Sequence, residues 1–403
     1  MNRCQPSSLL EPRRILVRGV NWLGDAVMTT PALQRLRERF PHAHITLLTH
    51  AKLAELWLHH PSLNAALTFG AGSGTWSVAR RLATGHFEMA LVLPNSPRSA
   101  LEVWLARIPQ RIGYAHAWRN WLLTQRVAAR PGHVGMRKRS RRQIEDLISG
   151  AGSSQHPSSV AAPVLRSSTA EGGLRRVDAS RITDRASSHQ IHDYLYLTSV
   201  LGASTELLAP KLEIRDGEVQ AAENKWLAEA RKVVPPPTND NPAIWLGLNP
   251  SAAYGPAKRW PAERYAAAAR EVSRRIGGCI WLSFGGANDV ALCAEIARRA
   301  SVNMLNLAGK TSLRELMALL RLCEVLLTND SGPMHLAAAL GTPVVVPFGS
   351  TDPELTGPGV PGDTRHRLLR SDAPCSPCFR RTCPIDLRCM TGISIASVVE
   401  AVM

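Results

Sequence analysis

Short apolar segments alternate with stretches of helical periodicity along this chain, and this alternation limits its fold more than any other feature. The runs Ile15–Val17, His44–Thr49 and Met89–Leu93 are predicted as strands, and residues 33–40 have helical spacing. Strands that alternate with helices favour a parallel sheet with helices packed on its faces. We therefore predict an α/β fold.

The same alternation returns in the second half of the chain. The predicted strands and helices there are Ile244–Leu248, Ala262–Arg275, Cys279–Ser283, Val290–Arg299 and 305–307. Ser312 and Glu315 have the spacing of a capping box, which predicts a helix that ends near Leu322. A second α/β domain follows from this pattern.

Length and composition agree with two domains. The chain has 403 residues, of which 45% are hydrophobic, and this suffices for about two packed cores. We assign residues 1–205 to the first domain and 206–403 to the second. Residues 150–188 are rich in Ser, Ala, Gly and Arg and lack apolar periodicity, so we interpret them as a disordered insertion.

The charge of the chain predicts a polyanionic partner. A formal net charge of +16 suits nucleic acid, an acidic membrane surface or a phosphorylated substrate, and charge alone does not choose among them. No aromatic-basic RNP stretch or zinc-finger spacing supports the nucleic-acid alternative. The N-terminal sequence has no apolar signal-peptide core, and no segment is apolar enough to span a membrane, so we expect a cytoplasmic protein.

Two loops in the second half follow predicted strands and precede predicted helices, as phosphate-binding loops do. Residues 328–335 bring Asp330, Ser331 and Gly332 to a helix start, where free N–H groups and the helix dipole favour an anion. An ordinary helix cap by Asp330 or Ser331 is the alternative. The loop 249–261 carries Lys258 within a Gly- and Pro-rich segment and is suited to a diphosphate.

A candidate general base lies in the first predicted loop. Asp25 follows the first strand, where an open α/β sheet presents active-site groups, and its carboxylate could accept a proton from a substrate hydroxyl. Capping of the following helix is the alternative role.

Four closely spaced cysteines lie near the end of the chain, at Cys375, Cys378, Cys383 and Cys389. Four thiolates could hold a structural zinc ion or an iron–sulfur cluster, although the spacing differs from that of zinc ribbons, and unligated thiols are the alternative. Three further cysteines lie on apolar segments and are predicted to be core residues: Cys279, Cys293 and Cys323.

Five motifs together resemble a known family. They are NWLGDAVMTTPAL (21–33), NPSAAYGPAKRWPAERY (249–265), TNDSGPMHLAAALGTPVV (328–345), FGSTDPELTGP (348–358) and CSPCFRRTCPIDLRCM (375–390). In this order they resemble the lipopolysaccharide heptosyltransferases, glycosyltransferase family nine, and within it the heptosyltransferase II branch. The resemblance covers nearly all of both domains outside the insertion.

The resemblance implies a GT-B architecture, in which two Rossmann-like domains face each other across a cleft. The first domain would bind the acceptor and the second ADP-heptose. The implied reaction is an inverting, metal-independent transfer of L-glycero-D-manno-heptose to the heptosyl-Kdo2-lipid A core of lipopolysaccharide. No cofactor is expected for catalysis.

The resemblance also implies roles for single residues. Asp25 matches the catalytic base of the family, Lys258 matches the lysine that contacts the donor phosphates, and Ser251 lies in the same donor loop. The donor diphosphate and heptose are expected at the motif that contains Asp330, Ser331, Gly332 and His335.

The acceptor is expected to be a phosphorylated or Kdo-bearing lipid at the cytoplasmic face of the inner membrane, which agrees with the basic charge. Acceptor contacts are predicted at Asn21 and at the basic cluster of Arg137, Lys138 and Arg139, for which a solvated linker is the alternative. Three tryptophans could line the acceptor cleft or pack in the core: Trp104, Trp118 and Trp121.

Three other functions stay open at this point. One is a family-nine transferase that uses another acceptor position or another nucleotide sugar. The others are a basic nucleic-acid-binding protein and a noncatalytic scaffold.

Overall fold

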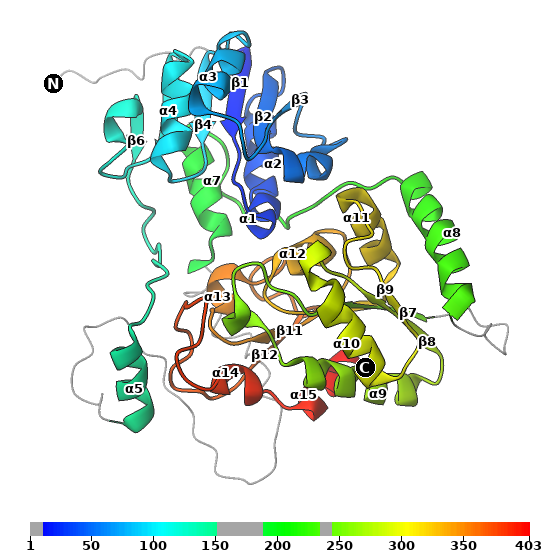
Figure 1. Cartoon of the computed structure of the whole chain (residues 1–403). Coiled ribbons are helices and arrows are strands. Elements are labelled where there is room, and N and C mark those ends of the chain that lie inside the picture. Colours follow the sequence, from blue (N-terminus) through cyan, green and yellow to red (C-terminus); the bar gives the residue numbers. More distant parts are fainter. Residues whose placement is uncertain (1–10, 151–187, 234–243) are drawn as a thin grey trace.

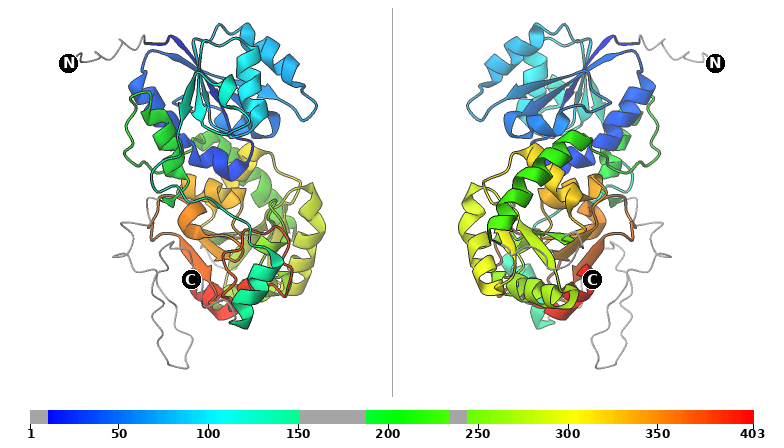
Figure 2. Two further views of the ribbon diagram at one scale, coloured as in Figure 1. Left: turned by 90° about the vertical axis from the view of Figure 1, so that its left-hand side faces the viewer. Right: turned by 90° about the vertical axis from the view of Figure 1, so that its right-hand side faces the viewer.

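The computed structural model describes residues 11–150, 188–233 and 244–403, with the side chains of 231–233 left aside. It has two α/β domains, which lie one above the other in Figures 1 and 2. Within the described residues each domain contains one six-stranded parallel sheet. The predicted α/β class with two domains is therefore confirmed.

The sheet of the first domain has the order β3-β2-β1-β4-β5-β6. Its strands are β1 (Arg14–Arg18), β2 (His44–His50), β3 (Ala65–Phe69), β4 (Met89–Val92), β5 (Gln110–Tyr114) and β6 (Gln125–Val127). The helices of this half of the chain are α1 (Leu23–Met28), α2 (Thr30–Arg39), η1 (Ala51–Trp57), α3 (Thr75–Ala83), α4 (Pro97–Leu105), η2 (Asn120–Leu122), α5 (Arg141–Ser149) and α7 (Ile191–Ser199).

The sheet of the second domain has the order β12-β11-β10-β7-β8-β9. Its strands are β7 (Ile244–Asn249), β8 (Cys279–Ser283), β9 (Met304–Asn306), β10 (Val325–Thr328), β11 (Val344–Phe348) and β12 (Arg367–Arg370). The helices are α8 (Asp216–Val233), η5 (Pro256–Lys258), α9 (Ala262–Ile276), η6 (Ala287–Asp289), α10 (Val290–Ala300), α11 (Leu313–Leu322), α12 (Gly332–Ala339), α13 (Pro353–Thr356), α14 (Arg388–Thr391) and α15 (Ile395–Val402).

Burial explains why the predicted strands form. Ile15, Leu16 and Val17 of β1 are fully buried, as expected of a strand in the middle of a sheet covered on both faces. The capping box that begins α11 is present, because the Ser312 side chain accepts from Glu315 N and the Glu315 carboxylate from Ser312 N. None of the helices in the described ranges combines the length and the apolar character that a membrane span requires.

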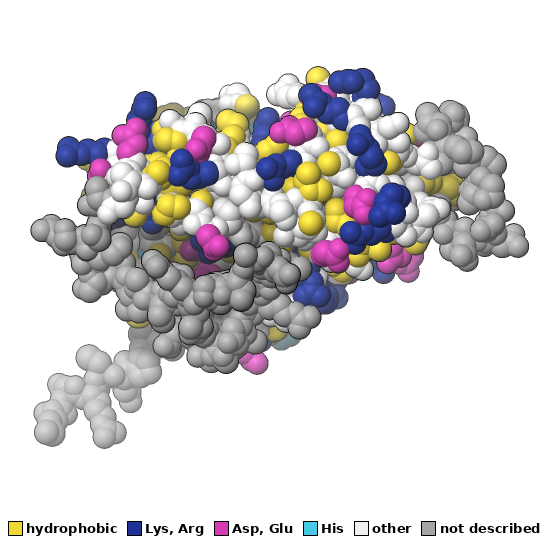
Figure 3. Space-filling model, turned by 90° about the horizontal axis from the view of Figure 1, so that it is seen from below, with side chains coloured by type: hydrophobic (Ala, Val, Ile, Leu, Met, Phe, Trp, Pro, Cys, Tyr) yellow, Lys and Arg dark blue, Asp and Glu magenta, His cyan; other side chains and the backbone are white. Residues whose placement is uncertain are grey.

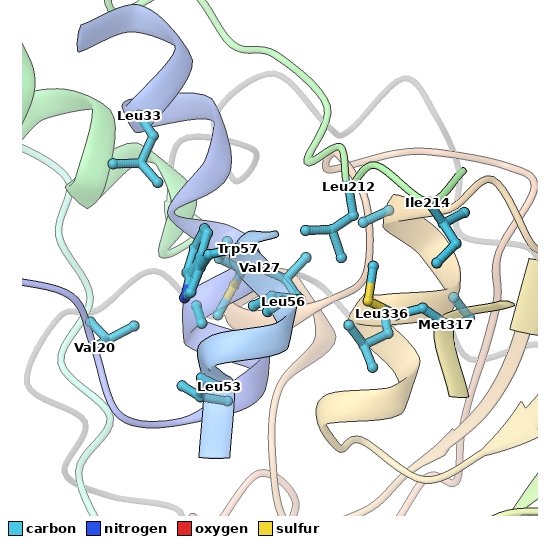
Figure 4. Close-up of a cluster of buried hydrophobic side chains, with 14 of the residues drawn as sticks. Val20, Val27, Leu33, Leu53, Leu56, Trp57, Leu212, Ile214, Met317 and Leu336 are labelled. Atoms are coloured by element: carbon cyan, nitrogen blue, oxygen red, sulfur yellow. The ribbon is translucent and has the colours of Figure 1, made fainter. Parts of the chain in front are cut away.

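The two domains share one hydrophobic core. Figure 4 shows Val27 of α1 and the side chains of η1 beside Met317 of α11 and Leu336 of α12. Leu212 and Ile214, on the segment that leads into the second domain, complete this cluster. Because the apolar contacts are continuous, the loops of one domain are held against those of the other.

One helix crosses from the first half of the chain to the second domain. Although α5 lies within the range predicted for the first domain, its Ile144 packs with Cys375 and Cys378. The Arg139 N–H, just before this helix, donates to the carbonyl of Cys378 at 3.0 Å. Ile144 is the apolar residue that α5 buries, and it finds its partners on the second domain. The predicted insertion, apart from its end residues 150 and 188, lies outside the described residues.

Strand order determines where a site can form. In the first sheet β1 lies beside β4, and in the second sheet β7 lies beside β10. At each of these places the strand order reverses, so the connections that follow the two neighbouring strands lead to opposite sides of the sheet. Ligands of open α/β sheets bind at the carboxyl ends of such strands. The loops after β1, β7 and β10 carry the predicted site residues.

Candidate active site

Helices α1 and α12 pack closely against each other at a glycine in each helix, Gly24 in α1 and Gly332 in α12. A Cβ atom added to Gly24 would lie 2.6 Å from Cδ2 of His335, and one added to Gly332 would lie 2.8 Å from Cδ2 of Leu23. Neither position has room for a side chain without displacement of its neighbour. The close approach of these helices brings the loop after β1 next to the loop after β10.

Asp25 is the third residue of α1 and does not cap it. The N-cap position is Trp22, and no side chain makes a cap hydrogen bond there. The half-buried carboxylate of Asp25 has its pKa raised from 3.8 to about 6, chiefly by desolvation; Lys258 lowers this pKa and Asp330 raises it. The capping alternative is therefore excluded, and the group titrates close to neutral pH, as a general base requires.

Lys258 and Asp330 form an ion pair beside this carboxylate. The ammonium Nζ lies 2.5 Å from Oδ2 of Asp330, and the Thr351 hydroxyl donates to the same oxygen at 2.5 Å. The Lys258 ammonium also lies 5.0 Å from the ring centroid of Tyr254. Asp330 thus holds the lysine at the start of α12, where its charge faces any ligand bound at this helix end.

The N-terminus of α12 is open to an anion. Ser331 occupies the N-cap position with extended backbone but makes no side-chain cap hydrogen bond. Its hydroxyl instead accepts from the amide Nδ2 of Asn249 at 3.2 Å. The capping alternative for Asp330 and Ser331 is therefore not realised, and the helix dipole and first-turn N–H groups favour negative charge at this end.

His335 lies on the buried side of α12. Burial lowers its pKa to about 4, while the charge of Asp330 acts to raise it. The imidazole is therefore neutral at pH 7, and it packs against Gly24 of the first domain. Ser251 lies in the loop after β7, where its carbonyl accepts from Nδ2 of Asn249 at 3.3 Å.

A buried asparagine joins the loops after β7 and β10. Oδ1 of Asn329 accepts from the N–H of Trp260 and from the hydroxyl of Tyr265, both at 2.9 Å, and its Nδ2 donates to the carbonyl of Pro250 at 2.8 Å. Asn329 was not among the predicted site residues, although it stands inside the 328–345 motif. It fixes the loop after β7 relative to the loop after β10.

The C-terminal segment supports the lysine loop. The Tyr254 hydroxyl donates to the carbonyl of Phe379 at 2.8 Å, and the Ala257 N–H donates to the carbonyl of Arg381 at 2.9 Å. A Cβ atom on Gly255 would overlap the Arg381 carbonyl oxygen, which explains the glycine at this position. The cysteine-rich tail therefore supports the loop that carries Lys258.

The four tail cysteines lie near one another but do not form a recognisable metal centre. Burial, and then the neighbouring thiols of Cys375, Cys378 and Cys383, raise the pKa of Cys389 to about 12. In the parts of the chain that the structure describes, no group of three or more His, Cys, Asp or Glu side chains is arranged to hold a metal. The zinc or iron–sulfur site stays a prediction. Cys279, Cys293 and Cys323 are buried, as predicted.

A cavity of about 630 Å³ opens beside Asp25 on the first domain. Arg130, His133 and Asp193 form an ionic cluster in its wall, with Arg130 Nε 3.1 Å and His133 Nδ1 2.9 Å from the Asp193 carboxylate. The Nη2 nitrogen of Arg130 is buried and has no hydrogen-bond partner within the described residues. An anionic group of a ligand would satisfy this nitrogen.

The predicted acceptor residues are only partly placed in this cavity. Asn21 lines it. Arg137 and Lys138 are exposed and do not line it, and Arg139 donates to the carbonyl of Cys375 at 3.0 Å. Arg130 and His133 were missed because they follow β6, which has three residues and too few apolar positions to be recognised from sequence.

Three tryptophans of the first domain were expected either to line the cleft or to pack in the core, and they do neither. Trp104, Trp118 and Trp121 do not line the cavity, and they are 39%, 84% and 62% exposed. They are therefore not core residues either.

The sequence and the fold were compared with known proteins. The model for Glycosyltransferase family 9 (heptosyltransferase) matches residues 159–388. Lipopolysaccharide heptosyltransferase 2 of Escherichia coli is 28% identical over 86% of this chain and 85% of its own length. Lipooligosaccharide heptosyltransferase 2 of Haemophilus influenzae is 28% identical over 89% of each.

Solved structures show the same architecture. The structure of E. coli ADP-heptose lps heptosyltransferase II has a TM-score of 0.67 and 24% identity, and covers 96% of this chain and 97% of that one. A glycosyl transferase family 9 structure from Veillonella parvula has a TM-score of 0.70 and 22% identity, with 96% and 95% covered. The predicted GT-B architecture is confirmed.

Proposed function

Because this chain belongs to glycosyltransferase family 9, the heptosyltransferases, we propose that it transfers L-glycero-D-manno-heptose from ADP-heptose to the heptosyl-Kdo2-lipid A inner core of lipopolysaccharide. Asp25 lies in the first domain, whereas Lys258 and Asp330 lie in the second. The charges of these two residues act on the pKa of the Asp25 carboxylate, and the mechanism rests on this observation. A base and a phosphate-binding lysine thus meet from opposite domains.

The geometry suggests how the reaction proceeds. Asp25 removes a proton from an acceptor hydroxyl in the cavity, and that oxygen attacks the anomeric carbon of the donor heptose. The bond from this carbon to the diphosphate breaks, and ADP leaves from the opposite face, so the configuration inverts. Lys258 and the N-terminus of α12 stabilise the negative charge that develops on the diphosphate. No metal ion takes part in these steps.

Donor contacts are assigned to the loops after β7 and β10. Ser251 and Lys258 would face the diphosphate from the first loop, and Ser331 and Gly332 from the second. Asp330 positions the lysine through the 2.5 Å ion pair. His335, neutral and buried, would shape the heptose pocket by packing rather than by charge.

The acceptor would enter the cavity of the first domain. Its phosphate or Kdo carboxylate would bind the guanidinium of Arg130, which lies in the cavity wall and has one buried nitrogen without a hydrogen-bond partner among the described residues. Since this acceptor is anchored in the inner membrane, the protein would work in the cytoplasm, in peripheral contact with that membrane.

The first experiment measures ADP release from ADP-heptose with and without heptosyl-Kdo2-lipid A. We expect acceptor-dependent release that falls by about two to four orders of magnitude in Asp25→Asn, the usual contribution of general acid–base catalysis. Absence of acceptor-dependent release by the unsubstituted protein would contradict the proposed acceptor. UDP- and GDP-sugars then test the alternative of another nucleotide sugar, and undiminished release by Asp25→Asn contradicts the role of the base.

Acceptor recognition is tested with two arginine variants. Arg130→Gln should raise KM for the acceptor with little change in KM for ADP-heptose, because Arg130 lines this cavity, whereas Ser251, Lys258, Ser331 and Gly332 do not. Arg137→Gln is the matched control, since Arg137 is exposed and outside the cavity wall. A raised acceptor KM in Arg137→Gln, with an unchanged acceptor KM in Arg130→Gln, would favour acceptor binding by the basic cluster at 137–139.

The cysteine tail is tested by metal analysis of the purified protein. A stoichiometric zinc or iron content that is lost in Cys375→Ser and Cys378→Ser would support the predicted structural site. A metal-free protein with four titratable thiols would favour the alternative.

A further inference from the structure

One continuous segment of the chain is free of acidic residues. Between Glu102 and Glu145 the chain has no Asp or Glu. The ten basic residues of this segment are Arg107, Arg111, Arg119, Arg126, Arg130, Arg137, Lys138, Arg139, Arg141 and Arg142. Much of the net positive charge is therefore concentrated in a part of the chain that runs from the end of α4 through β5 and β6 to the start of α5.

The same segment exposes three tryptophans. The side chain of Trp118 is 84% exposed, and Trp121 and Trp104 form an edge-to-face pair with ring centroids 5.5 Å apart. Exposed apolar side chains that form a contiguous patch, as Trp104 and Trp121 do, mark interaction sites more often than single exposed ones. Trp in particular is enriched where an apolar phase meets water, because its ring is apolar and its N–H is polar.

Two arginines are hydrogen-bonded to the backbone of the tryptophan-bearing segments. Arg107 follows α4, and its N–H donates to the Trp104 carbonyl at 2.9 Å, while Arg126 Nε donates to the carbonyl of Asn120, next to Trp121, at 3.0 Å. Arg107 and Arg126 are both exposed. We call Trp104, Arg107, Trp118, Trp121 and Arg126 the tryptophan–arginine surface.

The loop that presents this surface is firmly held. The Arg111 guanidinium donates to the carbonyl of Leu122 at 2.8 Å and to that of Ile108 at 2.6 Å, and Arg119 donates to the carbonyl of Pro94. Asn120 Oδ1 accepts from the N–H of His116 at 2.9 Å. These bonds tie the loop after β5 to the rest of the domain, so the exposed rings are built into the fold.

The surface adjoins the mouth of the acceptor cavity. His116, two residues before Trp118, lines that cavity. In Figure 1, α4 and β6 lie along the left-hand side of the first domain, and the second domain lies below it. By contrast, the face of the molecule seen from below mixes Lys and Arg with Asp, Glu and apolar side chains (Figure 3).

We propose that the tryptophan–arginine surface docks the protein on an anionic phospholipid surface. The indole rings enter the headgroup region, the guanidinium groups of Arg107 and Arg126 contact lipid phosphates, and the cavity mouth then faces the membrane in which the acceptor is anchored. This inference deepens the proposed function, on which the identity of the acceptor rests, but lipid binding itself requires neither ADP-heptose nor acceptor.

The test is co-sedimentation of the full chain with vesicles of phosphatidylethanolamine and phosphatidylglycerol, without donor or acceptor. We expect binding that is lost when phosphatidylcholine replaces phosphatidylglycerol. Arg107→Ser and Arg126→Ser should each weaken it by roughly fivefold at low salt, the effect of one basic residue near an anionic membrane. Trp118→Ser with Trp121→Ser should weaken it at low and high salt alike, because salt does not screen the apolar contact.

Matched controls separate docking from general charge and from misfolding. Trp76→Ser removes an exposed tryptophan outside the acid-free segment, and Arg298→Ser with Arg367→Ser removes two exposed charges of the second domain. Both should bind vesicles as the unsubstituted protein does, and all variants should release ADP normally with a water-soluble, deacylated acceptor.

If the control variants lost vesicle binding to the same extent, the proposal would be overturned. Undiminished vesicle binding by Trp118→Ser with Trp121→Ser would overturn it as well. Binding to a single-stranded oligonucleotide rather than to vesicles would assign the surface to nucleic acid instead. A protein that binds vesicles through this surface but releases no ADP would contradict the proposed function and leave the docking surface intact.

Discussion

Replacement of Asp25 by Asn should abolish activity and stabilise the protein at the same time. In the folded protein the pKa of Asp25 is raised from 3.8 to about 6, with desolvation as the main cause. Since one pKa unit corresponds to about 1.4 kcal/mol, ionisation of this group at neutral pH costs the fold about 3 kcal/mol. The neutral amide of Asn avoids this cost.

The sign of the pH dependence follows from the raised pKa. Because the folded protein holds this proton more tightly than the unfolded chain, Asp25 favours the fold below pH 3.8, and this contribution is lost as pH rises to about 6. The stability difference between Asp25→Asn and the unsubstituted protein should therefore be largest above pH 7 and should shrink toward pH 5.

Urea unfolding at pH 7.5 and pH 5, beside the ADP-release assay, checks both effects. The same ionisation should appear in kcat/KM as an acidic limb near pH 6, with about a tenth of the maximal rate one pH unit lower. An Asn variant that is inactive but less stable at pH 7.5 would refute this reasoning, because it would indicate a structural rather than a catalytic carboxylate.

Three further predictions concern the neighbourhood of this base. Lys258→Met should shift the acidic limb of the pH–rate profile to higher pH, and Asp330→Asn should shift it to lower pH. The reason is that Lys258 lowers the pKa of Asp25 and Asp330 raises it. Shifts of both variants in the same direction would contradict this. Gly24→Ala should sharply reduce activity, because its Cβ would lie 2.6 Å from His335, whereas normal kinetics would show that α1 and α12 can separate without loss. Met317→Ala should lower the free energy of unfolding by about 2–5 kcal/mol in urea titrations, since this fully buried side chain joins the domains; a change below about 1 kcal/mol would mean that the shared core collapses around the cavity.

Periodicity was sufficient to locate the buried strands. Ile15–Val17 and Cys279–Ser283 are continuous apolar runs, and both are strands in the middle or inner part of a sheet. The edge strand β6 has three residues, two of them exposed, so it has no apolar run from which it could be recognised. Residues that depend on its position, such as Arg130, were therefore missed.

Loop chemistry also predicted which loops of the second domain would lie at the site. The small polar residues after Val325–Leu327 and the basic loop at 249–261 are local features, because a strand, a loop and a helix start follow one another in sequence. Asp25 could be proposed for the same reason. By contrast, the sequence suggested acceptor contacts at 137–139, where positive charge is dense but the chain lies outside the cavity.

The sequence by itself determined the two α/β domains, their central strands and the loops that carry polar groups, since each depends on residues close together in the chain. Only the tertiary structure decided that the Asp25 carboxylate is desolvated near Lys258 and Asp330, that Arg130 lines the cavity beside Asp25, and that Trp118 is exposed. These properties depend on distances between segments far apart in sequence, and on which surfaces those segments cover, and neither is encoded in local periodicity.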